Sequence, residues 1–160
     1  MTERSVEHAS FSFERNYEAS PAEVFAAWAD PAAKARWFRN PEGWVGGAYE
    51  LDFRVGGRES QSGGPEGGPM NIYRALYWDI IQNERIVYTY EMLEDETRVS
   101  VSLAVVELEP ADGTRLKLTE HGAFLDGRDS AARRTQGMGS LLDALGELLR
   151  GETPTIQPSG

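Results

Sequence analysis

Hydrophobic side chains alternate with polar ones through most of this chain, the pattern of strands with one buried face. The first such segment, FSFERNYE at residues 11–18, places Phe11, Phe13 and Tyr17 on one side. The same period returns in AYELDFRV and then in NIYRALYWDII, RIVYTYEM, RVSVSLAVVEL and TRLKLTEHGAF. Short turn sequences join the later segments, so we expect an antiparallel meander. A glycine-rich stretch, GGPEGGP at residues 63–69, is expected to form a flexible hairpin tip.

Directly after the first strand, the hydrophobic residues change from alternating positions to the spacing of a helix. Ser20, Pro21 and Glu23 combine a capping box with proline at the first helical position. Asp30 followed by proline repeats the start signal, which predicts a second short helix ending near Trp37. We therefore expect two short helices in tandem behind one strand.

A second helical pattern lies near the end of the chain, and it predicts one long helix over residues 129–149. Its apolar residues share one face: Met138, Leu141, Leu142, Leu145, Leu148 and Leu149. The expected architecture is α+β: a curved antiparallel sheet of six or seven strands wrapped around the C-terminal helix. We expect residues 1–10 to be an extension, residues 11–150 a single domain and residues 151–160 a flexible tail.

Composition narrows the class of protein. Hydrophobic residues make up 40% and charged residues 26% of the 160, which is typical of a globular chain, and no apolar run reaches the ~18 residues of a membrane span. The formal net charge of -10 argues against nucleic acid as a partner. The chain has no cysteine, and its N-terminus has no apolar signal segment, so we expect a cytoplasmic protein.

The element order and several phrases resemble one known group of proteins. ERNYEASPAEVFAAWADPAAKARWF, ELDFRVGGRE, ERIVYTYEM and GTRLKLTEHGAFLDG are similar to the START-like (SRPBCC) helix-grip superfamily, and within it to homologues of the activator of the heat-shock protein 90 ATPase. Two features depart from the pattern: QGMGSLLDAL stands where relatives often have a Gly-Trp pair, and the SGGPEGGP tip is unusually rich in glycine.

The resemblance implies a cavity between the sheet and the long helix, which the superfamily uses for lipids, hormones, polyketides and other apolar molecules. It does not imply one function. The eukaryotic activator carries a separate N-terminal chaperone-binding domain for which we expect no room in this chain, so a chaperone partner or a role in the stress response is not supported by the family label alone.

Alternation along the strands, together with the final helix, indicates which side chains would line such a cavity. The candidates for ligand binding are Tyr49, Leu51, Phe53, Tyr73, Trp78, Tyr88, Tyr90, Val101, Glu120, Phe124, Met138 and Leu142. Buried tyrosine hydroxyls need hydrogen-bond partners, which a ligand could supply, but the same rings could simply fill the core. Tyr73 and Trp78 lie on opposite faces of one strand, and a bulge would decide which of them points inward.

Glu120 continues the face of Leu116 and Leu118, where an isolated charge is costly. Either its carboxylate points into the concave side of the sheet, or the strand ends or bends so that Glu120 lies on a solvated rim. Adjacent residues of a strand face opposite ways, so His121 is expected to point outward.

Other chemistry is sparse in the sequence. With no cysteine and only His8 and His121, we expect no metal site, and neither GGPEGGP nor GMGS is a nucleotide-binding motif, so no cofactor is expected. Two functions remain, and a protein-interaction or stress-response module acting on a chaperone or another client is a third alternative, which would need an exposed apolar patch. The first is a binding protein for a small apolar or amphipathic ligand, with no catalytic residue, as a monomer or homodimer. The second is a cavity enzyme of cyclase or dehydratase type, with Glu120 as acid or base and Tyr88 or Tyr90 polarising a carbonyl.

Overall fold

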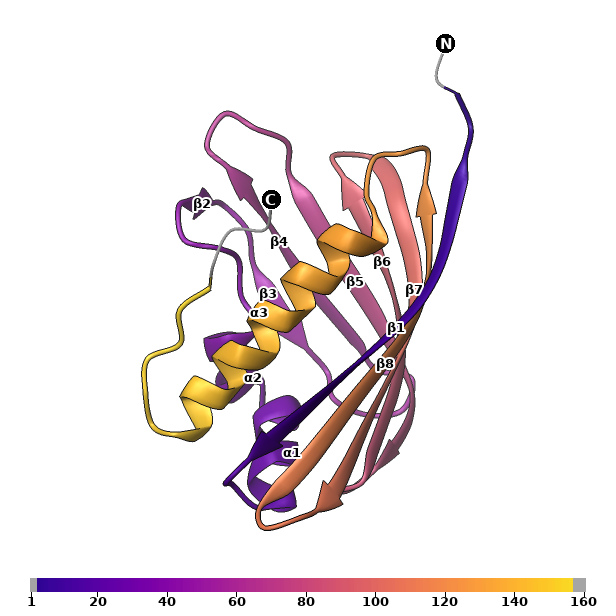
Figure 1. The fold of residues 1–160 in the computed structure, drawn as a ribbon. Coiled ribbons are helices and arrows are strands. Elements are labelled where there is room, and N and C mark those ends of the chain that lie inside the picture. The colour runs from indigo at the N-terminus through magenta and orange to yellow at the C-terminus, as the bar shows by residue number, and fades with distance from the viewer. Residues whose placement is uncertain (1–2, 157–160) are drawn as a thin grey trace.

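The computed structural model describes residues 3–156, and its elements follow the order that the sequence predicts. The helices are α1 (Pro21–Ala29), α2 (Pro31–Trp37) and α3 (Ala131–Leu149). The strands are β1 (Val6–Tyr17), β2 (Trp44–Val45), β3 (Tyr49–Leu51), β4 (Arg58–Pro65), β5 (Asn71–Ile81), β6 (Arg85–Glu94), β7 (Thr97–Pro110) and β8 (Thr114–Leu125). Figure 1 shows one curled sheet with α3 lying along its concave face.

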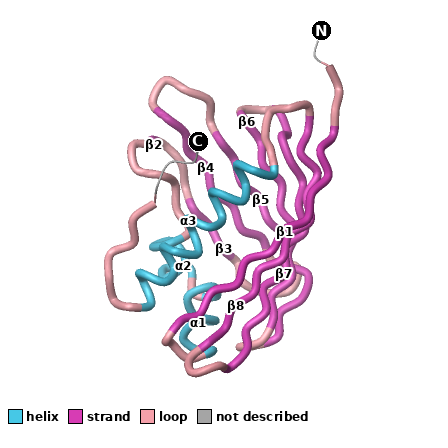
Figure 2. Tube along the Cα trace, in the orientation of Figure 1, coloured by secondary structure: helices cyan, strands magenta, loops and turns pink. Residues whose placement is uncertain are grey.

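All strand pairs in the described residues are antiparallel, and together they form an eight-stranded sheet in the order β1-β8-β7-β6-β5-β4-β2, with β3 also paired to β4. The predicted α+β helix-grip fold is confirmed, with eight strands in place of the expected six or seven, because the short β2 in a predicted loop also pairs with β4. The first strand pairs with the last, so the chain places its N-terminal strand beside β8. Figure 2 shows the helices gathered on one side of the sheet.

The short helices begin where the sequence predicts. The Ser20 side chain accepts a hydrogen bond from the backbone of Glu23, and the Glu23 side chain accepts one from the backbone of Ser20, which completes the capping box. Asp30 ends α1 and begins α2, so the two helices are separated by one extended residue. This tight junction lets Trp28 and Trp37 pack edge to face, with ring centroids 4.8 Å apart.

Both ends of the chain are more ordered than the sequence predicts. β1 begins at Val6 rather than at Phe11, because residues 6–10 continue the ladder with β8. The described part of the expected tail, residues 151–156, makes contacts with the rest of the domain. The Pro154 carbonyl accepts a hydrogen bond from Arg39 at 2.8 Å, and Ile156 is only 6% exposed because it covers an apolar surface. Residues 157–160 of the predicted tail lie outside the described residues.

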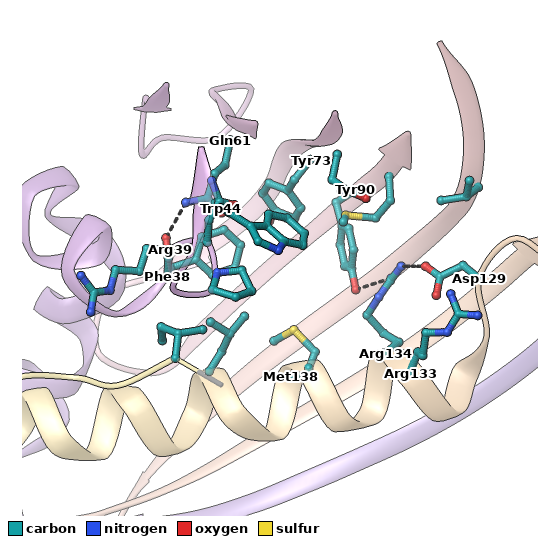
Figure 3. Close-up of a pocket in the computed structure, with 18 of the residues that line it drawn as sticks. Phe38, Arg39, Trp44, Gln61, Tyr73, Tyr90, Asp129, Arg133, Arg134 and Met138 are labelled. Atoms are coloured by element: carbon teal, nitrogen blue, oxygen red, sulfur yellow. Dashed lines mark hydrogen bonds and ion pairs between the residues drawn. The ribbon is translucent and has the colours of Figure 1, made fainter. Parts of the chain in front are cut away.

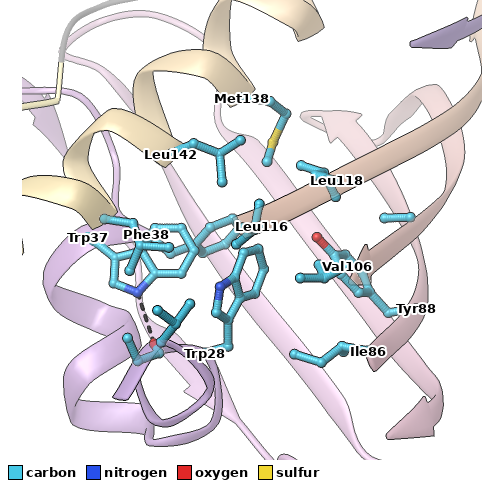
Figure 4. Packing of buried hydrophobic residues seen from close by; sticks show 14 of the residues in the cluster. Trp28, Trp37, Phe38, Ile86, Tyr88, Val106, Leu116, Leu118, Met138 and Leu142 are labelled. Carbon is cyan, nitrogen blue, oxygen red and sulfur yellow. Dashed lines mark hydrogen bonds between the residues drawn. The ribbon is translucent and has the colours of Figure 1, made fainter. Parts of the chain in front are cut away.

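The hydrophobic core fills the end of the molecule where α1 and α2 close the sheet. Figure 4 shows Trp28, Trp37, Ile86 and Leu116 packed there, with Leu142 of α3 above them. None of the helices between residues 3 and 156 has the length and apolar character needed to cross a bilayer.

Candidate functional site

A pocket of about 340 Å³ opens beside the N-terminal half of α3, over β5 and β6. Figure 3 shows its wall, which α3, the sheet and the segment after α2 supply together. The apolar part of the wall consists of Phe38, Pro41, Trp44, Tyr73, Tyr88, Tyr90, Met92, Val99, Met138, Leu141 and Ile156. Its volume lies at the lower end of the ~300–1,000 Å³ typical of small-molecule sites.

Ten of the twelve predicted ligand-binding residues face the interior and fall into three groups. Tyr73, Tyr88, Tyr90 and Met138 line this pocket. Glu120 and Phe124 are buried just behind its wall, each 1% exposed. A third group belongs to the core or to a neighbouring hollow, and consists of Leu51, Phe53, Leu142 and Tyr49.

Two predicted residues, Trp78 and Val101, face away from the pocket. Trp78 is 58% exposed, because alternation runs unbroken from Tyr73 to Tyr77 and the bulge in β5 comes only after Tyr77. Its indole nitrogen donates a hydrogen bond to Thr89 Oγ1 on the convex face. Val101 is 45% exposed, because a register shift in the β6–β7 pair resets the alternation of β7. Both predictions of a cavity position are therefore wrong.

The reset alternation of β7 turns small polar residues inward. Ser100, Ser102 and Ala104 lie on the concave face, and Val101 lies on the convex one. The serines serve a buried cation: Arg134 Nη2 donates to Ser100 Oγ at 2.8 Å, and Arg134 Nη1 lies 3.4 Å from Ser102 Oγ. An apolar β7 face would have left this guanidinium without partners.

Arg134 completes a network that reaches Glu120. Arg134 Nη1 donates to the Tyr90 hydroxyl at 2.9 Å, and that hydroxyl donates to Glu120 Oε1. Asp129 Oδ2 accepts from Arg134 Nη2 at 2.7 Å and balances its charge. Glu120 therefore points into the concavity, as one of the two sequence interpretations expected, but Arg134 and Tyr90 separate it from the pocket space.

Burial is the largest cause of the pKa shifts of Glu120 and Tyr90 in this network. It raises the pKa of the Glu120 carboxyl, while the hydrogen bond from Tyr90 and the charge of Arg134 oppose that rise. Glu120 Oε2 has no hydrogen-bond partner among the described residues. The pKa of the Tyr90 hydroxyl is raised too, first by burial and then by the nearby carboxylate. An unpaired buried oxygen is consistent with a carboxyl that holds its proton more readily than usual.

Sequence reasoning missed Arg134, although a signal was present. Arg134, Met138 and Leu142 are spaced four residues apart, so the arginine lies on the apolar stripe of α3. A charge on such a stripe needs a partner inside the protein.

A second buried polar cluster lies deeper in the molecule, and it was also missed. Lys34 of α2 is 0% exposed, and its Nζ lies 2.9 Å from Glu59 Oε2. The same carboxylate accepts hydrogen bonds from the hydroxyls of Tyr49, Tyr73 and Tyr77. Burial lowers the pKa of Lys34, and the charge of Glu59 opposes that change. Neither Lys34 nor Glu59 lines the pocket. The ion pair between them joins α2 to β4, so the cluster stabilises the contact between that helix and the sheet.

Among residues 3–156, no three side chains of His, Cys, Asp or Glu are grouped so that they could hold a metal ion.

Comparison with known proteins places this architecture in a family. Residues 18–150 match the family model described as Activator of Hsp90 ATPase homolog 1-like protein. An uncharacterized protein from Rhizobium leguminosarum is 43% identical and superposes with a TM-score of 0.89, over 94% of this chain and 100% of that one. A protein from Rhizobium loti is 45% identical, with a TM-score of 0.82 over 89% and 97% of the two chains. No curated protein matches.

Proposed function

We propose that this chain, which belongs to the family described as Activator of Hsp90 ATPase homolog 1-like protein, binds a small apolar or amphipathic molecule in the pocket beside α3. The family by itself names no ligand. The proposal therefore depends on the chemistry of the pocket wall, in which aromatic rings and methionine side chains lie beside arginine, carboxylate and amide side chains.

One side chain carries the proposal: Tyr88. It lines the pocket and is 2% exposed, and among residues 3–156 its hydroxyl has no hydrogen-bond partner, whereas those of Tyr73 and Tyr90 are bonded to carboxylates. The Tyr88 hydroxyl is not one of the fully buried side-chain atoms that lack a partner, so it reaches the open space of the pocket. A polar group of a bound molecule is a suitable partner, which supports a binding site over a filled core.

Native mass spectrometry of protein purified without added ligand tests the proposal directly. We expect a mass excess of one small molecule per chain, which denaturation releases for identification. Titration with a neutral apolar dye, N-phenyl-1-naphthylamine, should give one site per chain even if the purified protein is empty.

A larger side chain at Gly137 would fill the pocket without overpacking the hydrophobic core. It lines the pocket, and a Cβ there would meet nothing within 4 Å. Gly137→Leu should abolish dye binding and leave the fold intact, because replacing a helical glycine gains roughly 0.5–1 kcal/mol. Gly139→Leu is the matched control, because its Cβ would approach Phe13 at 3.5 Å, away from the pocket. Equal dye binding by both variants and the parent protein would contradict the proposed site.

Proton-transfer catalysis is a second candidate, favoured by the Tyr90 hydroxyl on the pocket wall between Arg134 and Glu120. Its test follows from the first experiment. The released molecule is incubated with the parent protein and with Tyr90→Phe, and its chemical change is followed by mass spectrometry and chromatography. A product formed by the parent alone supports catalysis, and an unchanged molecule supports binding without reaction.

A further inference from the structure

Positive charge gathers at the pocket although the chain as a whole is acidic, with a formal net charge of -10. Four arginines line the pocket against two carboxylates. The arginines are Arg39, Arg128, Arg133 and Arg134, and the carboxylates belong to Glu94 and Asp129. A local excess of cations in an acidic protein favours an anionic ligand.

Both carboxylates already have arginine partners. Asp129 pairs with Arg134 at 2.7 Å, and Glu94 lies 3.8 Å from Arg128. Among the ion pairs of residues 3–156, none involves Arg39 or Arg133. Each of these two guanidiniums donates instead to a backbone carbonyl, which leaves its charge uncompensated.

The end of the pocket near Arg133 holds three of the four arginines and both carboxylates, and Arg133 is the arginine there that pairs with neither carboxylate. Figure 3 shows Arg133 beside Arg134, at the start of α3, and Arg39 at the opposite end of the pocket wall. Arg133 lies in the first turn of α3, where the helix dipole is positive, although the Glu7 carboxylate accepts a hydrogen bond from the Ala131 backbone at 3.2 Å and offsets part of it. Arg39 instead follows the C-terminal end of α2, where the dipole has the opposite sign.

The apolar part of the pocket favours an aromatic hydrocarbon. Tyr73, Tyr88 and Tyr90 form a row of rings with neighbouring centroids 5.1 Å and 6.0 Å apart, and Met138 faces them from α3. Aromatic rings and thioether sulfur both pack well against another ring. A space of about 340 Å³ accommodates a compact ring system.

We propose that the ligand of this pocket is a compact aromatic carboxylate, whose ring packs between Tyr88, Tyr90 and Met138 and whose carboxylate pairs with Arg133. The inference rests on the proposed binding function and adds the charge and class of the ligand. A planar guanidinium can donate two parallel hydrogen bonds to a carboxylate, which a neutral isostere cannot accept as strongly.

Three probes of nearly equal shape separate charge from hydrophobic contact: 2-naphthoate, 2-naphthamide and 2-naphthamidine, which are anionic, neutral and cationic. Isothermal titration at pH 7 should show naphthoate binding about tenfold more tightly than naphthamide, and naphthamidine most weakly. The preference for naphthoate should shrink between 50 and 500 mM NaCl, because salt screens an exposed ion pair. Dodecanoate, as a fatty carboxylate, should bind more weakly than naphthoate.

Arg133→Gln should weaken naphthoate binding about fivefold to tenfold and leave naphthamide binding unchanged, and Arg133→Lys should restore part of the loss. Arg74→Gln is the matched control, because Arg74 is an exposed arginine of β5 outside the pocket. The same charge is removed in both variants, so a general field effect would change them equally.

The outcomes distinguish this inference from the proposed function. Equal affinity for naphthoate and naphthamide, with no effect of Arg133→Gln, would overturn the anionic class while binding itself stands. Tighter binding of dodecanoate would overturn the aromatic class. If no probe and no neutral dye binds, the proposed function fails, and this inference fails with it.

Discussion

The Tyr90 hydroxyl donates a hydrogen bond to Glu120 Oε1 across an intervening strand. Tyr90 is on β6 and Glu120 is on β8, so about 9.5 Å separates their strands. The β7 residues paired with them are Ser102 and Ala104, which are small enough to let the two side chains meet above the sheet. The bond thus depends on the register of three strands.

Replacing Glu120 with glutamine tests the protonation of this bond. The folded pKa of Glu120 lies above its usual value of 4.5, so its contribution to stability is fully present below pH 4.5 and is lost as pH rises through the folded pKa. Glu120→Gln should therefore be neutral or stabilising at pH 7, and its advantage over the parent should grow between pH 4 and pH 7. Thermal melts across that range measure the difference. A stability difference between the variant and the parent that stays constant from pH 4 to pH 7 would contradict the raised pKa.

Tyr90 and Tyr88 should respond differently to loss of their hydroxyls. Tyr90→Phe should lower the free energy of unfolding by about 1–3 kcal/mol, because it leaves the buried Glu120 carboxyl without a hydrogen-bond partner and removes one of the partners of Arg134. Tyr88→Phe should change stability by less than about 0.5 kcal/mol, since its hydroxyl has no protein partner among residues 3–156. Urea unfolding of both variants checks this. Equal losses would mean that the Tyr88 hydroxyl has an internal partner.

The buried pair of Lys34 and Glu59 should be strongly coupled. Lys34→Met should cost about 3–5 kcal/mol, because it leaves an uncompensated carboxylate at a position with 0% side-chain exposure. The double variant with Glu59→Gln should recover part of that loss, since it leaves no charge buried. A double-mutant cycle by chemical denaturation measures the coupling, and additive losses would contradict it.

Met138 and Leu142 lie one helical turn apart on α3 and should differ in their tolerance of a larger side chain. Met138→Trp should fill the pocket and abolish dye binding with little loss of stability, because Met138 lines open space. Leu142→Trp should cost about 1–3 kcal/mol, because Leu142 is 0% exposed in a packed core. Thermal melts and dye titration separate the two effects. Two equally destabilised variants would indicate a filled interior.

Local patterns in the sequence determined the order and type of the elements. Ser20 and Glu23 mark the start of α1, because capping depends on residues within one turn. Asp30 followed by proline marks the start of α2 by position, although the Asp30 side chain makes no capping hydrogen bond. The apolar stripe likewise determined α3, which begins two residues after the predicted position 129 and ends at Leu149 as predicted. The placement of Glu120 on the face of Leu118 followed from alternation alone, since β8 carries no bulge that resets it.

Only the tertiary structure decided which face of β7 is buried. The segment RVSVSLAVVEL predicts an inward Val101, yet the register shift opposite Met92 and Leu93 turns Ser100 and Ser102 inward. A bulge depends on pairing with a neighbouring strand, and a single strand carries little sign of it. The buried serine hydroxyls have a hydrogen-bonding role because they accept from Arg134, which lies more than 30 positions away in the sequence.

The same reason explains why the polar interior was missed. Lys34 and Glu59 are 25 residues apart, and Arg134 and Tyr90 are 44 apart, so no local spacing connects either pair. Hydrophobic period identifies a buried face because it repeats within one element. The way in which the sheet curls around the helices determines which groups lie next to a buried charge. It also determines which part of the interior is packed core and which part is pocket.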